Sequence, residues 1–220
     1  AVQRASGVGT GFIVVPLIAM IDVTYLPGPL VLATISLSTL MVWREWSHVD
    51  FKAVPWILSG FVPGAAIGAW ALTAIAPDQL GFLFGGVILF AVLLTALGLH
   101  PPLNRISSVI TGLVSGAMGA SSGVGAPPLA ILYHRASGAV LRATLAILYT
   151  VCSILILIVL AAFGSFGAEE ALTGLLQIHG FLVGYRLGAH FVAYVEDAGV
   201  RTPVLVLSAQ AAVALIAKSF

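Results

Sequence analysis

Residues 106–134 read ISSVITGLVSGAMGASSGVGAPPLAILYH, and this stretch decides how the chain is folded. Two apolar parts, 106–120 and 126–134, flank the segment Gly123-Val124-Gly125, and two prolines follow it. At 1.5 Å per residue, helices over these parts would be about 22 Å and about 13 Å long, shorter than the ~30 Å hydrocarbon core of a bilayer. The pattern therefore predicts two half-helices joined at glycines, either in line or folded back as a hairpin.

The rest of the chain is similarly apolar. Of 220 residues, 60% are hydrophobic, with nine Lys or Arg and eight Asp or Glu. A soluble domain carries about a quarter of charged residues, so the composition predicts an all-α, multi-pass protein of the (inner) cell membrane. The net charge of +1 and the single cysteine, Cys152, indicate neither a nucleic-acid partner nor a disulfide framework. The apolar blocks are 8–21, 27–43, 53–76, 79–98, 106–120, 126–134, 138–163, 168–190 and 199–217.

Basic residues distinguish the two arrangements of 106–134. If this stretch is one span, the Lys and Arg of the loops divide evenly between the two sides of the membrane. If it is a re-entrant hairpin, seven lie on one side and only Lys218 on the other. The seven are Arg44, Lys52, Arg105, Arg135, Arg142, Arg186 and Arg201. Because basic residues of short loops accumulate in the cytoplasm, the count favours the hairpin and a cytoplasmic 44–52 loop.

The chain also contains an internal repeat. The segment Gly7–Gly11 resembles Gly123–Pro127 at an offset of 116, and Gly64 and Gly68 match two later glycines, 180 and 184, at the same offset. We expect two inverted-topology repeats, 1–100 and 101–220, each with a glycine-rich re-entrant or broken helix and three transmembrane helices. The helix expected before Gly7 is missing, which predicts a truncated start. The stripe containing Gly64 and Gly68 is interpreted mainly as a packing surface.

The two glycine segments are the candidate binding site. Backbone that is not helical persists at membrane depth only where protein or a water-filled cavity satisfies it. Glycine permits positive φ, expected at Gly9 and Gly125, and proline suits a first helical turn. Helix N-termini beside such turns attract anions, so we expect an anion near the midplane between the two turns. The predicted site residues are Gly7, Gly9, Thr10, Gly11, Ser36, Gly123, Gly125, Ala126, Pro127 and Thr144.

Polar side chains inside the blocks have two interpretations. The hydroxyls of Ser36 and Thr144 could line the site or bond carbonyls of their own helices. His179, in the middle of block 168–190, is the candidate for a coupled proton, with structural hydrogen bonding as the alternative. A proton or sodium ion is the expected coupling partner. No cofactor or metal is indicated, and the sequence leaves open whether a homodimer forms.

The glycine segments resemble a known family. Gly7-Val8-Gly9-Thr10-Gly11, with Pro16-Leu17 after four apolar residues, is similar to the signature of TauE/SafE sulfite exporters. The second copy, from Gly112 to Leu129, resembles that family's second motif. The resemblance implies a permease, not an enzyme, that moves sulfite, a sulfonate such as sulfoacetate, or a related organosulfur anion. Thr10 and Ala126 stand where the family usually has glycine, so the substrate can differ.

Two other functions fit parts of the sequence. Gly119-Ala120-Ser121-Ser122-Gly123 matches the Gly-x-Ser-x-Gly elbow of hydrolases, and with His179 it could form a rhomboid-like Ser–His protease. The flank of the serine reads as helix rather than strand, which argues against that site. A passive anion channel on the same repeats stays open as the other alternative.

Overall fold

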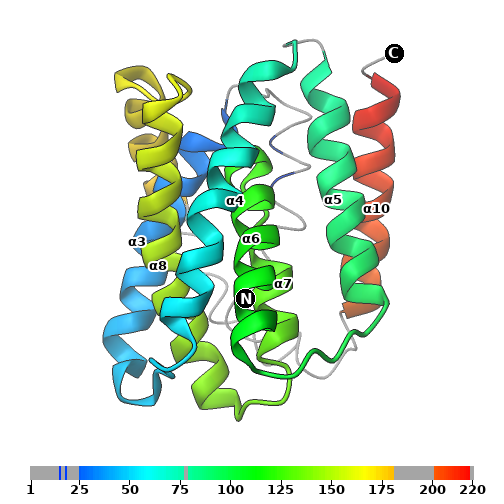
Figure 1. Cartoon of the computed structure of the whole chain (residues 1–220). Helices are drawn as coiled ribbons and strands as arrows, with labels where there is room; N and C mark the ends of the chain where they lie inside the picture. Colours follow the sequence, from blue (N-terminus) through cyan, green and yellow to red (C-terminus); the bar gives the residue numbers. More distant parts are fainter. Residues whose placement is uncertain (1–14, 16–17, 19–24, 77–78, 181–200, 219–220) are drawn as a thin grey trace.

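The computed structural model describes residues 15, 18, 25–76, 79–180 and 201–218 of the chain (Figure 1). Regular structure in this part is helical throughout. The helices are α3 (Gly28–Glu45), the short 3-10 helix η2 (Trp46–His48), α4 (Val54–Ala74), α5 (Leu80–Ala96), α6 (Arg105–Ser122), α7 (Ala126–Leu132), α8 (Gly138–Ala162), a helix described over 168–180, and α10 (Arg201–Lys218). The predicted division of 106–134 into two helices is confirmed.

The outer surface of the helix bundle is apolar. Trp43 is 89% exposed, Ile106 71% and Leu176 68%, whereas the buried polar residues of the described part are serines and threonines. A water-soluble protein would place its apolar side chains inside. By length and composition, α4 and α8 could each cross a membrane, while α5, with 17 residues, is shorter. These features agree with a membrane protein.

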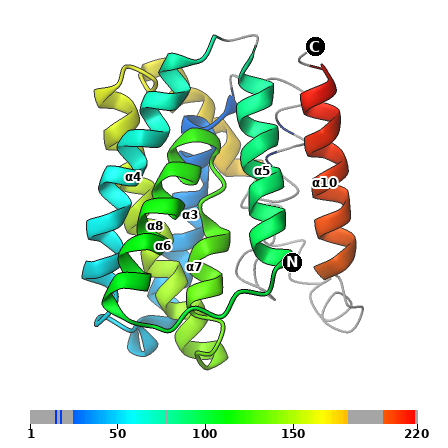
Figure 2. The same cartoon turned by 45° about the vertical axis from the view of Figure 1, so that its right-hand side comes forward.

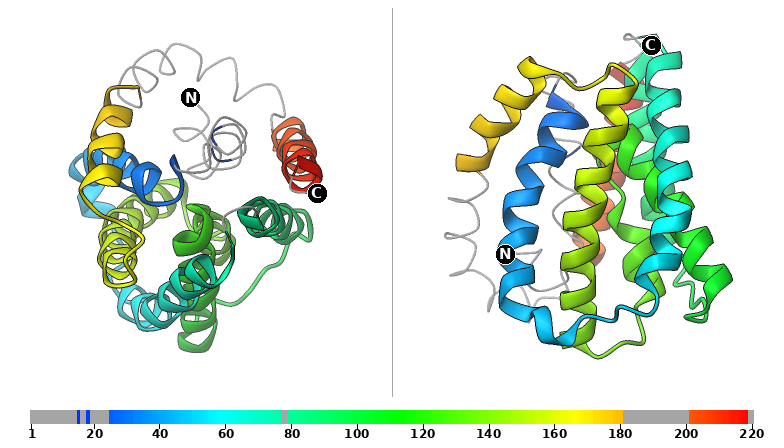
Figure 3. Two further views of the ribbon diagram at one scale, coloured as in Figure 1. Left: turned by 90° about the horizontal axis from the view of Figure 1, so that it is seen from above. Right: turned by 60° about the vertical axis from the view of Figure 1, so that its left-hand side comes forward.

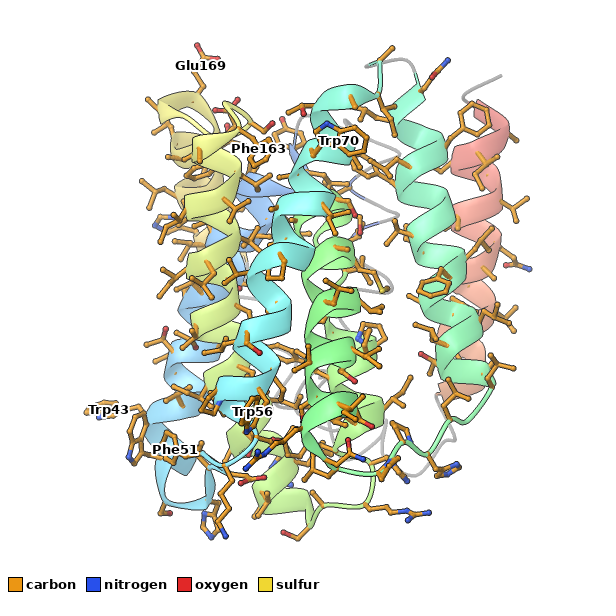
Figure 4. All side chains as sticks on the ribbon, in the orientation of Figure 1. Trp43, Phe51, Trp56, Trp70, Phe163 and Glu169 are labelled. Atoms are coloured by element: carbon orange, nitrogen blue, oxygen red, sulfur yellow. The ribbon has the colours of Figure 1, made fainter. Side chains whose placement is uncertain are left out.

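Aromatic side chains gather near both ends of the bundle. Trp43, Phe51 and Trp56 lie at the end where α3 meets α4, and Trp70 and Phe163 lie near the opposite end (Figure 4). All five side chains are exposed. Tryptophan prefers the level of the lipid headgroups, so these two groups mark where the surfaces of a bilayer would lie.

The helices alternate in direction. In Figure 1, α3, α5 and α7 run downward and α4, α6, α8 and α10 run upward. Connections 46–53, 97–104 and 133–137 and the start of α10 therefore share one end, here called the basic end. Six of the seven basic residues counted above lie at or near it: Arg44, Lys52, Arg105, Arg135, Arg142 and Arg201. Lys218 lies at the opposite end, and Arg186 lies outside the described residues.

Glycines bring α4 and α6 into direct backbone contact. The contact is reciprocal, because glycines of each helix face carbonyl groups of the other. A Cβ added to Gly60 would lie 2.0 Å from the Val109 oxygen, one on Gly64 2.1 Å from the Leu113 oxygen, and one on Gly112 2.0 Å from the Ile57 oxygen. Real Cβ atoms do not approach so closely, so only glycine fits. The interpretation of this stripe as a packing surface is confirmed.

Candidate functional site

The turn between α6 and α7 is the candidate site that the structure describes. Helix α6 ends at Gly123, whose φ of 80° is left-handed and whose N–H donates to the Gly119 oxygen at 2.8 Å. Helix α7 begins three residues later and runs back along α6, so the two form an antiparallel pair (Figure 2). We call this pair the α6–α7 hairpin, and residues 123–125 its tip.

Gly125 differs from the expectation. Its φ is −91°, so the prediction of positive φ there was wrong. Glycine is needed at this position for another reason, the close approach to α6. A Cβ on Gly125 would lie 2.7 Å from the Ser115 backbone oxygen and 3.2 Å from the Gly119 Cα.

Ser115 holds the tip in place, and the sequence analysis missed it. The side chain is fully buried, and its hydroxyl donates to the Gly125 oxygen across the hairpin. A trans peptide points its C=O and N–H in opposite directions. With the Gly125 carbonyl turned toward α6, the Ala126 N–H is directed away from α6. Nothing in the spacing of a helical serine identifies a partner ten residues later.

Few backbone donors remain at the tip. Pro127 and Pro128 occupy the first turn of α7, as predicted, but proline has no N–H. The Gly123 N–H is bonded within the turn, and the Val124 N–H points to the Ser122 hydroxyl oxygen at 3.3 Å. Within the described part of the chain, the N–H groups of residues 125 and 126 are the donors at the tip that make no hydrogen bond.

The tip is surrounded by side chains from both halves of the chain. Val124 is buried in one apolar cluster with Leu30 of α3, Phe84 of α5 and Leu215 of α10. Val15, which belongs to the predicted block 8–21, is fully buried in the same cluster. One described residue from each of the two predicted glycine blocks therefore belongs to the same apolar cluster. Gly7, Gly9, Thr10 and Gly11 themselves lie outside the described residues.

The two predicted hydroxyl ligands make structural hydrogen bonds. Ser36 donates to the Ala33 oxygen of its own helix at 2.7 Å, which is the local alternative given above. Thr144 is fully buried, and its oxygen accepts the Asp50 N–H at 2.9 Å. Thr144 thus fixes connection 46–53 to α8 near the basic end.

The predicted proton carrier lies on the surface of the described helices. His179, in the helix described over 168–180, is exposed. The hydrolase-like motif also lacks its required geometry. Ser121 is buried in α6 and donates to the Ala117 oxygen at 2.7 Å, and no strand precedes it in the described chain. The described residues also hold no cluster of three metal-binding side chains.

Comparison with known proteins gives the family. The model of the family described as "Sulfite exporter TauE/SafE" matches residues 1–215. A probable sulfite/organosulfonate exporter TauE of Cupriavidus necator is 26% identical over 204 residues, covering 86% of this chain and 78% of the relative. No solved structure matches. The apolar exterior, the broken helix and the match along nearly the whole chain agree, and the protein belongs to the TauE/SafE sulfite exporter family, whose members are membrane transporters and not enzymes.

Proposed function

We propose that the protein is a secondary transporter, a multi-pass permease of the inner cell membrane, for a small sulfur-containing anion such as sulfite, a sulfonate or sulfoacetate. The observation that carries the proposal is the break between α6 and α7 at Gly123, inside a bundle with an apolar exterior. Broken helices at membrane depth are where secondary transporters bind substrate. The family and the printed name of the relative support the substrate class.

The proposed architecture has two inverted repeats, residues 1–100 and 101–220, with the α6–α7 hairpin re-entrant from the cytoplasm. Support comes from helices that correspond at the offset of 116. Helix α3 corresponds to α8, and α5 corresponds to α10. Each pair packs together and runs antiparallel, as Figures 1 and 3 show. Inversion predicts opposite directions for corresponding helices.

The proposed substrate site lies near the midplane, between the tip and the glycine segment 7–11. The N–H groups of Gly125 and Ala126 are the donors that the described half would offer to an oxyanion. Buried Lys or Arg is absent from the described residues, and α7, with seven residues, has only a short helix dipole. A site with so little positive charge should prefer a singly charged anion over a dianion, because a buried unpaired charge is costly. The proposed residues are Gly7, Gly9, Thr10, Gly11, Gly123, Gly125, Ala126 and Pro127, whereas the hydroxyls of Ser36 and Thr144 are already used in hydrogen bonds of the fold.

Transport assays on the purified protein in liposomes test this function. We expect uptake of sulfite or a simple alkyl sulfonate, with sulfate and acetate much slower. Accumulation above the external concentration, driven by a proton or sodium gradient, would separate a transporter from a passive channel. Equilibration without accumulation under every gradient would favour the channel. Absence of flux for every sulfur anion would refute the proposal.

Cysteine accessibility tests the topology. In a Cys152→Ala background, single cysteines at His48, Arg135 and Glu169 report on the two ends of the bundle. We expect the first two to react from the cytoplasm and the third from the opposite side. Labelling of His48→Cys and Arg135→Cys from opposite sides would contradict the inverted arrangement.

A further inference from the structure

Two histidines meet at the base of the α6–α7 hairpin. His100 belongs to connection 97–104, before α6, and His134 to connection 133–137, after α7. Their ring centroids lie 4.4 Å apart, and the rings are nearly perpendicular at 75°. The contact therefore joins the two ends of the hairpin. His100 is exposed, whereas His134 is half-buried.

Hydrogen bonding defines the protonation of His134. Its Nδ1 lies 2.8 Å from the Ile131 oxygen, near the C-terminus of α7. A carbonyl oxygen can only accept, so Nδ1 carries the hydrogen and Nε2 of the neutral ring keeps a lone pair. That Nε2 atom is covered and makes no hydrogen bond within the described chain. The ring of His134 thus presents one nitrogen whose lone pair is unused within the described chain.

The charges around the pair are mostly positive. Helices α5 and α7 contribute no charged side chain. The Arg105 guanidinium, at the start of α6, lies 4.8 Å from the centroid of the Trp56 ring, and the charge of Asp50 acts on Tyr133, the residue before His134. The titratable and charged residues on the described elements at this end are Arg44, Glu45, His48, Asp50, Lys52, Arg105, Tyr133, Arg135, Arg142 and Arg201. Basic residues thus outnumber acidic ones at the end of the bundle where the pair lies.

We propose that His100 and His134 form a proton-binding site of the transporter, which binds one proton at Nε2 of His134 and loses the ring contact when both rings are charged. A cationic ring against a neutral ring is attractive, whereas two cations at this separation repel. Because the pair joins both ends of the hairpin, its protonation would change how firmly the hairpin base is held. The role in coupling rests on the proposed transport function, but proton binding by the pair does not.

Histidine titration by NMR tests the site independently of transport. With His48, His179 and His190 replaced by glutamine, selectively labelled protein retains only the pair. We expect the His134 ring to take up the first proton, and in the further variant His100→Gln its proton affinity to fall by about threefold, because the attraction between the neutral His100 ring and the cation is lost. His100 is exposed, so this variant should fold; His100→Phe keeps an aromatic ring against the cation and should restore the native affinity. An unchanged His134 affinity in His100→Gln would overturn the proposal.

Transport by liposomes containing the protein tests the coupling. We expect His134→Gln and His100→Gln each to remove the pH dependence of accumulation while exchange persists, and the double variant to add nothing. His48→Gln, on the exposed η2 helix, should keep the native pH profile. An unaltered profile in both pair variants, or its loss in His179→Gln alone, would refute the coupling role. If the native protein moves no sulfur anion, the proposed function fails, and the NMR result still decides whether the pair binds protons.

Discussion

Replacing Gly123 by alanine tests the hairpin tip as a binding site. Gly123 has φ of 80°, and the one atom near an added Cβ is Leu30 Cδ2 at 3.3 Å, the end of a flexible side chain. The cost therefore comes mainly from the left-handed backbone, about 1–2 kcal/mol for an L-residue with a Cβ. Gly164 is a matched control, because its φ is 73° and a Cβ there would meet nothing within 4 Å. It lies between α8 and the helix described over 168–180, far along the chain from the tip.

We expect both variants to lose similar stability, about 1–2 kcal/mol, in thermal unfolding in detergent. Only Gly123→Ala should weaken binding of the best anion, by about tenfold or 1.4 kcal/mol, because relief of the strain rotates the N–H groups of the tip. Calorimetry on the two purified proteins measures this difference. Native affinity in Gly123→Ala, or the same loss of affinity in Gly164→Ala, would refute the assignment of the tip to the site.

Two further predictions concern packing and ionisation. Gly64→Ala should destabilise the protein by about 1–3 kcal/mol, because its Cβ would meet the Leu113 backbone oxygen at 2.1 Å. The control Gly86→Ala, whose Cβ would meet nothing within 4 Å, should be neutral or stabilising. Equal unfolding temperatures of the two variants would contradict this prediction. Burial and the nearby Asp50 charge raise the pKa of Tyr133 above its usual 10.0. The neutral phenol therefore stabilises the fold fully below about pH 10 and progressively less above it. Tyr133→Phe should accordingly lose less stability than the native protein between pH 10 and 11.5. The same decrease of unfolding temperature with pH in both proteins would disprove this.

The sequence predicted the boundaries of α6 and α7 well because glycines and prolines lie at these boundaries. Helix α6 ends within two residues of the predicted position, and α7 begins at Ala126 as expected. Both boundaries depend on local backbone chemistry, namely the left-handed turn at Gly123 and the missing N–H groups of the prolines. Six of the seven basic residues of the charge count lie at one end of the described helices, whereas the re-entrant entry of the hairpin and the cytoplasmic side stay predictions.

Contacts between distant residues could not be predicted in the same way. Ser115 looks like any small helical residue until the hairpin brings Gly125 beside it. His100 and His134 are 34 positions apart in connections without periodicity, so no pattern pairs them. His179 is exposed on the described helices, because the apolar character of its block does not determine which side chains face the neighbouring helices. The first glycine segment stays a prediction.

The reciprocal glycine contact between α4 and α6 has a mechanical consequence. Two backbones that touch without intervening side chains cannot slide or roll without collision, so α4 and α6 act as one lever. The hydroxyl of Ser115 adds the tip of the hairpin to that lever. If the proposed transport uses alternating access, its sliding surface has to lie elsewhere. The side chains of Val124, Phe84 and Leu215 offer one, because they meet in a single apolar cluster between helices. Helices α5 and α10 would therefore form the side of the pathway that moves, and helices α4 and α6 the side that stays fixed.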